Sequence, residues 1–254
     1  MSQHTPDKKL SPPGQPERSE GPPDGHAPRC HPERSEGPPD GSAAVKKRAP
    51  DPYAHAPLLP VSGVCELVDI HTLATGEGYE MEIGPGRGGF IFERLEARPG
   101  VAMVNLEIRR KWATIVDDRL KARGYGRRAR VFAEDAKESL PRLGPDGVLD
   151  VIYLHFPDPW WKKRHTKRLV MGDVFLREVS RLLHDKGALY IQTDVEERAA
   201  QYEEHVMQSG LFKPAGDTAD SPRMAENPYG ARSPREHRAV ADGLPVHRMR
   251  FAKA

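Results

Sequence analysis

Two spacings of hydrophobic residues alternate along the chain from about residue 57 onward. Short, nearly continuous apolar runs that stop at a glycine or an acid are typical of strands buried in a sheet. Longer stretches with apolar residues three and four positions apart are typical of helices that bury one face. The predicted strands are therefore 79–84, 101–108, 129–135, 148–156, 187–194 and 246–251, and the predicted helices are 88–97, 110–124, 171–187 and 196–210.

The order of these elements predicts the fold class. Because strands and helices alternate, we expect a doubly wound α/β domain over residues 57–254, with helices on both faces of one sheet. The expected sheet has seven strands and is mostly parallel. Its final strand, "VHRMRF" at 246–251, alternates apolar and polar residues and is expected to run antiparallel to its neighbour.

Residues 1–56 show neither spacing. This segment holds 12 of the 25 prolines, and it contains two copies of "PERSEGPPDG", at 16–25 and 32–41. The repeated unit has no apolar positions that could pack against a neighbouring repeat. Since the segment cannot bury enough apolar surface to offset the entropy lost on ordering, we predict a disordered tail rich in proline and glycine.

Charge and cysteine content narrow the possible partners only slightly. Lys and Arg number 39 and Asp and Glu number 37, so a nucleic-acid partner has to be inferred from local clusters. The two cysteines, Cys30 and Cys65, have no metal-binding spacing, and we expect no metal. With no apolar leader and no apolar run long enough to cross a bilayer, we expect a cytoplasmic protein that binds no membrane. No additional apolar helix face is evident, which favours a monomer.

A glycine-rich turn, "EIGPGRGG", joins the first predicted strand to the first helix. Gly84, Gly86 and Gly88 allow a tight turn and a close approach of the backbone to a ligand. Alone, this pattern equally suits a nicotinamide dehydrogenase. Glu82 precedes the turn, where its charge would repel a pyrophosphate but would attract a sulfonium ligand that carries an amino group.

Two further acids follow the next strands. Glu107 ends the second strand about 20 residues beyond the turn, where a carboxylate can accept both hydroxyls of a ribose. Asp135 ends the third strand, where it could reach the amino group of an adenine. Each acid alone could instead cap the helix that follows it. Together with Glu82 and the glycine turn, they favour S-adenosyl-L-methionine as the ligand.

The segment "LHFPDPWWKKRHTKRLV", at 154–170, combines an acid, two aromatics and a basic cluster. Asp158 stands at the tip of the fourth strand between two prolines that restrict the backbone. Its carboxylate could accept hydrogen bonds from a guanine edge, and Trp160 and Trp161 could stack on bases. Phosphates could be neutralised by the basic side chains Lys162, Lys163, Arg164, His165, Lys167 and Arg168.

Less specific interpretations of these residues remain open. At least one of the two tryptophans could be ordinary core packing, and a run of charges is often only a solvated face. The basic residues Arg109, Arg110 and Lys111 could extend an RNA-binding track or could simply face solvent.

Three motifs together, "EIGPGRG", "FPDPWWKKRHTKRLV" and "TDVEERA", resemble those of the bacterial tRNA (guanine-N7-)-methyltransferases. The resemblance extends from about residue 60 to the C-terminus. It implies a Rossmann-like methyltransferase sheet and transfer of a methyl group from S-adenosyl-L-methionine to N7 of a guanine in the variable loop of tRNA. Alternatives are a methyltransferase of the same fold that acts on another RNA or a protein, and a non-catalytic RNA-binding relative.

The resemblance also implies roles for individual residues. Asp158 would be the catalytic carboxylate of the active site. The methyl donor would be bound by Glu82, Gly84, Gly86, Gly88, Glu107, Asp135 and Asp158. The tRNA would be bound by Lys162, Arg164, His165, Asp194, Ser233, Arg235 and Glu236. This chain reads "SPRE" where the family has Thr-x-x-Glu, and it has Trp161 where the family often has histidine.

Overall fold

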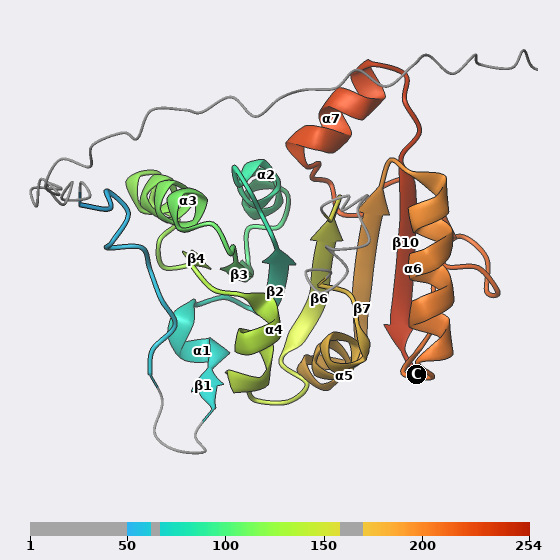
Figure 1. The fold of residues 1–254 in the computed structure, drawn as a ribbon, viewed down its shortest axis with the longest axis horizontal. Helices are drawn as coiled ribbons and strands as arrows, with labels where there is room; N and C mark the ends of the chain where they lie inside the picture. Colours follow the sequence, from blue (N-terminus) through green and yellow to red (C-terminus); the bar gives the residue numbers. More distant parts are fainter. Residues whose placement is uncertain (1–49, 62–66, 158–169) are drawn as a thin grey trace, which may run out of the picture. The chain divides into compact units, whose positions relative to one another are not determined.

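The computed structural model describes residues 50–61, 67–157 and 170–254. Their central sheet has eight strands in the order β4-β3-β2-β6-β7-β10-β8, with β9 beside β10 (Figure 1). The strands are β2 (Gly78–Ile83), β3 (Val101–Leu106), β4 (Ala129–Phe132), β6 (Leu149–His155), β7 (Leu183–Thr193), β8 (Phe212–Pro214), β9 (Arg223–Met224) and β10 (His247–Lys253).

The directions of the strands confirm the predicted fold class. Strands β4, β3, β2, β6 and β7 are parallel, and β10 runs antiparallel to β7. The sheet has one strand more than the predicted seven. The six strands placed from the sequence are all present, whereas β8 and β9 are too short for an alternating pattern to reveal them.

Helices cover both faces of this sheet. Helices α2 (Gly89–Ala97) and α3 (Arg110–Ala122) pack on one face, and α1 (Ile70–Leu73), α4 (Ala136–Ser139), α5 (Asp173–Leu182) and α6 (Glu196–Gln208) pack on the other. Consecutive residues of β3 divide between the two cores: Met103 packs with α2 and α3, and Val104 packs with the opposite layer. Both cores are apolar, which explains why the strands read as continuous hydrophobic runs.

The remaining elements are short. Strands β1 (Val68–Asp69) and β5 (Leu143–Gly144) form a separate two-stranded sheet, and a 3₁₀ turn covers Leu140–Arg142. Helix α7 (Pro234–Ala241) lies beyond the carboxyl ends of the parallel strands (Figure 1). The compact unit that contains the sheet spans Ala49–Ala254, and its described part begins ahead of the expected boundary at residue 57. The predicted tail otherwise lies outside the described residues.

The predicted helix 171–187 extends too far. Helix α5 ends at Leu182, and β7 begins at the next residue, Leu183, which is fully buried and pairs with Leu149 of β6. The pairing then shifts, so that Ala188 pairs with Val151. The residues before Gly187 therefore form an irregular part of the strand, and this glycine does not end the helix.

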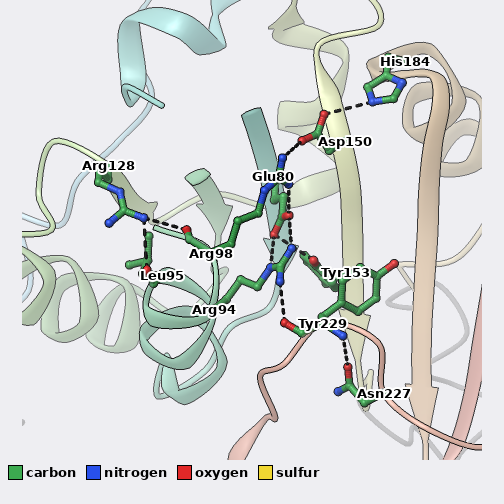
Figure 2. Close-up of polar contacts among 10 residues, drawn as sticks. All are labelled: Glu80, Arg94, Leu95, Arg98, Arg128, Asp150, Tyr153, His184, Asn227 and Tyr229. Carbon is green, nitrogen blue, oxygen red and sulfur yellow. Dashed lines mark hydrogen bonds and ion pairs between the residues drawn. The ribbon is translucent and has the colours of Figure 1, made fainter. Parts of the chain in front are cut away.

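A buried ionic network joins the middle of the sheet to α2 (Figure 2). The carboxylate of Glu80, on β2, is fully buried and accepts two hydrogen bonds from Arg94, at 2.7 and 2.8 Å. It also accepts hydrogen bonds from Arg98 at 2.7 Å and from the Tyr153 hydroxyl at 2.9 Å. Burial, reinforced by the negative charge of Glu80, raises the pKa of Tyr153 well above its usual value, so the hydroxyl remains a donor.

Helices of the described residues are all too short or too polar to cross a lipid bilayer.

Candidate active site

A cavity of about 700 Å³ opens at the carboxyl ends of the parallel strands. Strand β2 lies between β3 and β6, so the chain leaves β2 in one direction and returns on its other side. In open parallel sheets, ligands bind at this point of reversal. The cavity has the volume expected of a small-molecule site, and its lining includes Gly84, Glu107, Asp135, His155, Phe156 and Pro157.

The glycine turn has the conformation that its sequence predicts. Gly84, Gly86 and Gly88 have backbone φ angles of +72°, +55° and +74°. Residues that carry a Cβ atom rarely adopt such values. A Cβ atom on Gly88 would also lie 2.4 Å from Cγ1 of Val116, on α3. The turn therefore needs glycine at this position both for its backbone angle and for the packing of α3.

Glu107 lines the cavity and holds the glycine turn. Its Oε2 atom accepts a hydrogen bond from the Gly86 backbone N–H at 2.9 Å. Its Oε1 atom accepts hydrogen bonds from the Arg109 backbone N–H at 2.9 Å and from the Arg109 Nε–H at 3.0 Å. The predicted ribose-binding acid thus lies at the cavity, where it also fixes the backbone of the turn.

Asp135 both caps a helix and lines the cavity. Its side chain caps α4 by accepting a hydrogen bond from the Lys137 backbone N–H at 3.0 Å. The same residue lines the cavity, next to Glu134 and Ala136. A helix cap holds a carboxylate in a defined position, which suits it to bind a ligand as well.

Apolar side chains complete the cavity. They are Ile83, Leu106, Ile108, Leu154, Val170, Met171 and Tyr202. Ile108 is a large hydrophobic residue that is 65% exposed, because it follows the end of β3. A lining that combines apolar side chains with a few polar groups is typical of sites that bind small molecules.

Glu82 is buried and does not line the cavity, although its neighbour His155 does. Its carboxylate is buried, and its Oε1 atom is 2.8 Å from Nδ1 of His155, a partner that the sequence analysis did not identify. Glu82 Oε2 and His155 Nε2 have no hydrogen-bond partner among the described residues. His155 was not predicted as a site residue, because its contact with Glu82 requires β2 and β6 to be neighbours in the sheet. The sequence pattern does not reveal which strands are neighbours.

Phe156 has a strained backbone at the edge of the cavity. Its φ angle is +44°, and its backbone N–H donates a hydrogen bond to the Gln192 carbonyl at 2.8 Å. Strained residues that are not glycine concentrate at functional sites. The next residue, Pro157, lines the cavity.

Six predicted site residues lie outside the described residues: Asp158, Trp160, Trp161, Lys162, Arg164 and His165.

Two of the predicted substrate residues are brought together at the ends of β7 and α7. Arg235 forms a two-pronged ion pair with Asp194, with its Nη2 atom at 3.0 Å from Oδ1 and at 2.8 Å from Oδ2. The Arg235 guanidinium also lies 5.2 Å from the centre of the Phe156 ring. Arg235 thus links α7 to the strained residue that precedes the cavity-lining proline.

Ser233 and Glu236 hold α7 in place. The Ser233 hydroxyl accepts a hydrogen bond from the Glu236 backbone N–H at 3.1 Å, and Pro234 occupies the first turn, where its missing N–H is not needed. The Glu236 carboxylate is fully buried and binds Arg248 at 2.9 Å and Asn227 at 3.0 Å. In this structure both residues therefore support the helix from inside, and neither side chain is exposed.

Residues 78–249 match a family described as "Putative methyltransferase". A tRNA (guanine-N(7)-)-methyltransferase of Myxococcus xanthus (strain DK1622) is 36% identical over 174 residues, which cover 68% of this chain and 82% of that protein. The protein of the same name from Anaeromyxobacter dehalogenans (strain 2CP-C) is 38% identical over 180 residues, which cover 70% and 87%. Among solved structures, the [4+2]-cyclase SpnF is 15% identical and covers 72% of this chain and 77% of its own, with a TM-score of 0.49.

Proposed function

The chain belongs to the tRNA (guanine-N7-)-methyltransferase family, and we propose that it transfers a methyl group from S-adenosyl-L-methionine to N7 of a guanine in tRNA. One structural observation supports this proposal: a single cavity is lined by Gly84 of the glycine turn, by Glu107 and Asp135, and by Pro157. Residues suited to hold the donor and the residue next to Asp158 therefore share one site. We further propose that the target is the variable-loop guanine, which the motif resemblance supports.

The cavity fits the proposed methyl donor. Glu107 is suited to the ribose hydroxyls and Asp135 to the adenine amino group, while Ile108 offers the adenine ring an apolar surface. Within the described residues, the buried Oε2 atom of Glu82 has no hydrogen-bond donor, and the ammonium group of the methionine part of the methyl donor would supply one. The glycine turn lets the backbone come close to the ligand.

The proposed reaction requires no proton transfer by the protein. When bound, the donor supplies a methyl group on a sulfonium, so that a C–S bond breaks as the N7–C bond forms and the positive charge moves to the guanine imidazole ring. Guanine N7 carries a lone pair and no proton, so the protein does not need a general base. We propose that Asp158 orients the guanine through its edge and stabilises the cationic product electrostatically.

The tRNA contacts are proposed from the basic segment and from the end of β7. Lys162, Arg164 and His165 would bind phosphates, and Trp160 or Trp161 would stack on a base. Asp194 and Arg235 lie at the same edge of the sheet, where they would position the substrate together with Phe156. We also propose that the protein works as a monomer in the cytoplasm, in keeping with a tRNA substrate.

The direct test is to map N7-methylguanine in tRNA before and after incubation with the purified protein and S-adenosyl-L-methionine. We expect one new N7-methylguanine, in the variable loop. Methylation of another RNA or of a protein, with tRNA left unmodified, would favour a different substrate. Tight tRNA binding with no heat of binding for the donor in calorimetry would indicate a non-catalytic relative.

A further inference from the structure

Four cations along α3 and the glycine turn are held against aromatic rings. We name this set the α3 stripe: Arg87, Lys111, Arg119 and Arg123. The Arg87 guanidinium and the Lys111 ammonium lie 5.1 and 5.5 Å from the centre of the Trp112 ring. The guanidinium groups of the other two members lie 4.8 and 4.7 Å from the centre of the Phe92 ring. Each cation is thus held in place by a contact that leaves its charge intact.

The acids on α3 are already paired with other cations. Asp117 is buried and binds Arg130 at 2.8 Å and Lys121 at 2.8 Å. Burial would raise the pKa of Asp117, but the hydrogen bonds from Arg130, from Lys121 and from a backbone N–H outweigh it and hold the pKa below its usual value. The neighbouring acid, Asp118, is 3.9 Å from Lys121. Within the described part of the chain, no carboxylate forms an ion pair with the α3 stripe.

The stripe starts beside the cavity and runs along the helix. Arg87 lies inside the glycine turn, and the Arg119 side chain donates a hydrogen bond to its carbonyl at 3.1 Å. Trp112, Arg119 and Arg123 are seven and four positions apart, so they share one face of α3. At 1.5 Å per residue, Lys111 and Arg123 are separated by about 18 Å along the axis. Among the residues that the structure describes, the stripe is therefore a line of cations without ion-pair partners, and it begins at the glycine turn.

We propose that the α3 stripe binds the phosphate backbone of the tRNA on one side of the methylated guanine. This rests on the proposed function, because tRNA is the polyanion that the site would act on. A row of exposed cations, fixed by aromatic rings and spaced along a helix, suits repeated phosphates. Since no member of the α3 stripe lines the cavity, the stripe contributes to tRNA affinity and not to donor binding.

The test removes three positive charges and measures tRNA affinity as a function of salt. In the triple variant Lys111→Gln, Arg119→Gln and Arg123→Gln, we expect tRNA binding to weaken by about tenfold or more and the slope of log K against log salt to fall by about two to three. A matched control, Arg177→Gln, Lys186→Gln and Lys213→Gln, removes the same charge from exposed positions on α5, β7 and β8. We expect the control to match the unaltered protein within about twofold, because it lies away from α3 and the glycine turn.

A charge-preserving variant separates electrostatics from packing, because Arg119 and Arg123 also cover Phe92. Arg119→Lys with Arg123→Lys is expected to keep the salt slope, and both sets of variants are expected to bind S-adenosyl-L-methionine normally in calorimetry. An unchanged slope in the glutamine variant, or an equal loss in the lysine variant, would overturn the proposal while tRNA methylation by the unaltered protein stands. If the unaltered protein left tRNA unmethylated, the proposed function itself would fail.

Discussion

Glu82 and His155 share one hydrogen bond of 2.8 Å inside a shell of aromatic side chains. The His155 ring lies 4.4 Å from the ring of Phe90 and 5.5 Å from that of Tyr153, measured between centroids. A buried carboxylate oxygen without a donor costs about 1–3 kcal/mol. Since Glu82 Oε2 has no donor in the described residues, the residue gains a hydrogen bond if a ligand supplies an ammonium group. His155 then acts as a positioning residue, because it fixes the other oxygen.

Replacing His155 tests this role. His155→Phe keeps a ring but removes the hydrogen bond to Glu82 Oε1. We expect the Kd for S-adenosyl-L-methionine to rise by about tenfold, because the Glu82 carboxylate is no longer held in place and this change corresponds to the loss of one hydrogen bond to a charged group. His155→Gln retains an amide donor and should restore most of the affinity. Calorimetry with methylthioadenosine, which lacks the amino acid part of the donor, serves as the control. Equal losses for both ligands would mean that His155 only supports the fold.

Asp158 follows the strained Phe156 and the cavity-lining Pro157, although it lies outside the described residues itself. Asp158→Asn removes the negative charge and keeps the shape of the side chain. We expect kcat to fall by at least tenfold, because the guanine loses electrostatic stabilisation as it becomes cationic. The Kd for S-adenosyl-L-methionine should change by less than about threefold. A collapse of donor affinity together with turnover would instead assign Asp158 to donor binding.

At the scale of elements, α7 is attached to the sheet by contacts of two kinds. Its first turn is fixed from inside by the Ser233 cap and by the buried pair of Glu236 with Arg248. Its outer surface reaches the edge of the sheet through Arg235, which binds Asp194 and lies over Phe156. We therefore expect the inner contacts to determine whether α7 forms, and the outer contact to position the backbone of Phe156 beside the cavity.

Removing the outer contact should therefore alter turnover more than stability. The Arg235–Asp194 pair is partly exposed, with side-chain exposures of 46% and 24%, so Arg235→Ala is expected to cost less than about 1 kcal/mol of unfolding free energy. We expect kcat to fall by about fivefold, and the double variant with Asp194→Asn to lose little more than either single variant. The control is Arg238→Ala on the same helix. A loss confined to the KM for tRNA would identify Arg235 as a direct substrate contact.

The sequence predicted the elements that depend on local pattern. The glycine turn and the acids Glu107 and Asp135 follow from strand ends, because the carboxyl ends of parallel strands meet at one edge. The left-handed backbone of Phe156 could not be predicted, since a residue before proline is normally extended. The early start of β7 at Leu183 was missed because four residues before Gly187 continue the helical spacing, while tertiary pairing with Leu149 draws them into the strand.

For the molecule as a whole, the buried network around Glu80 joins parts of the chain that are distant in sequence (Figure 2). Arg94 binds Glu80 and also donates a hydrogen bond to the Tyr229 carbonyl, while the Tyr229 backbone N–H binds Asn227 at 3.0 Å. Asn227 in turn binds the buried Glu236 of α7. The segment that carries α7 is thus tied to the centre of the sheet through consecutive polar contacts.

The network predicts a graded loss of stability. Glu80→Gln leaves the buried Arg94 without a counter-ion, whereas Arg98 keeps its ion pair with Asp150 at 2.9 Å. We therefore expect the unfolding free energy to fall by about 3–5 kcal/mol, mainly through Arg94. Arg94→Gln should cost somewhat less, and Arg98→Gln least, because the Arg98 side chain is 40% exposed and the Arg94 side chain 10%. Urea unfolding, followed by two spectroscopic probes, measures this order. If the two arginine variants lost the same unfolding free energy, the predicted order would be wrong. Solvent would then not screen Arg98, and the stability of the network would depend on the geometry of its hydrogen bonds and not on burial.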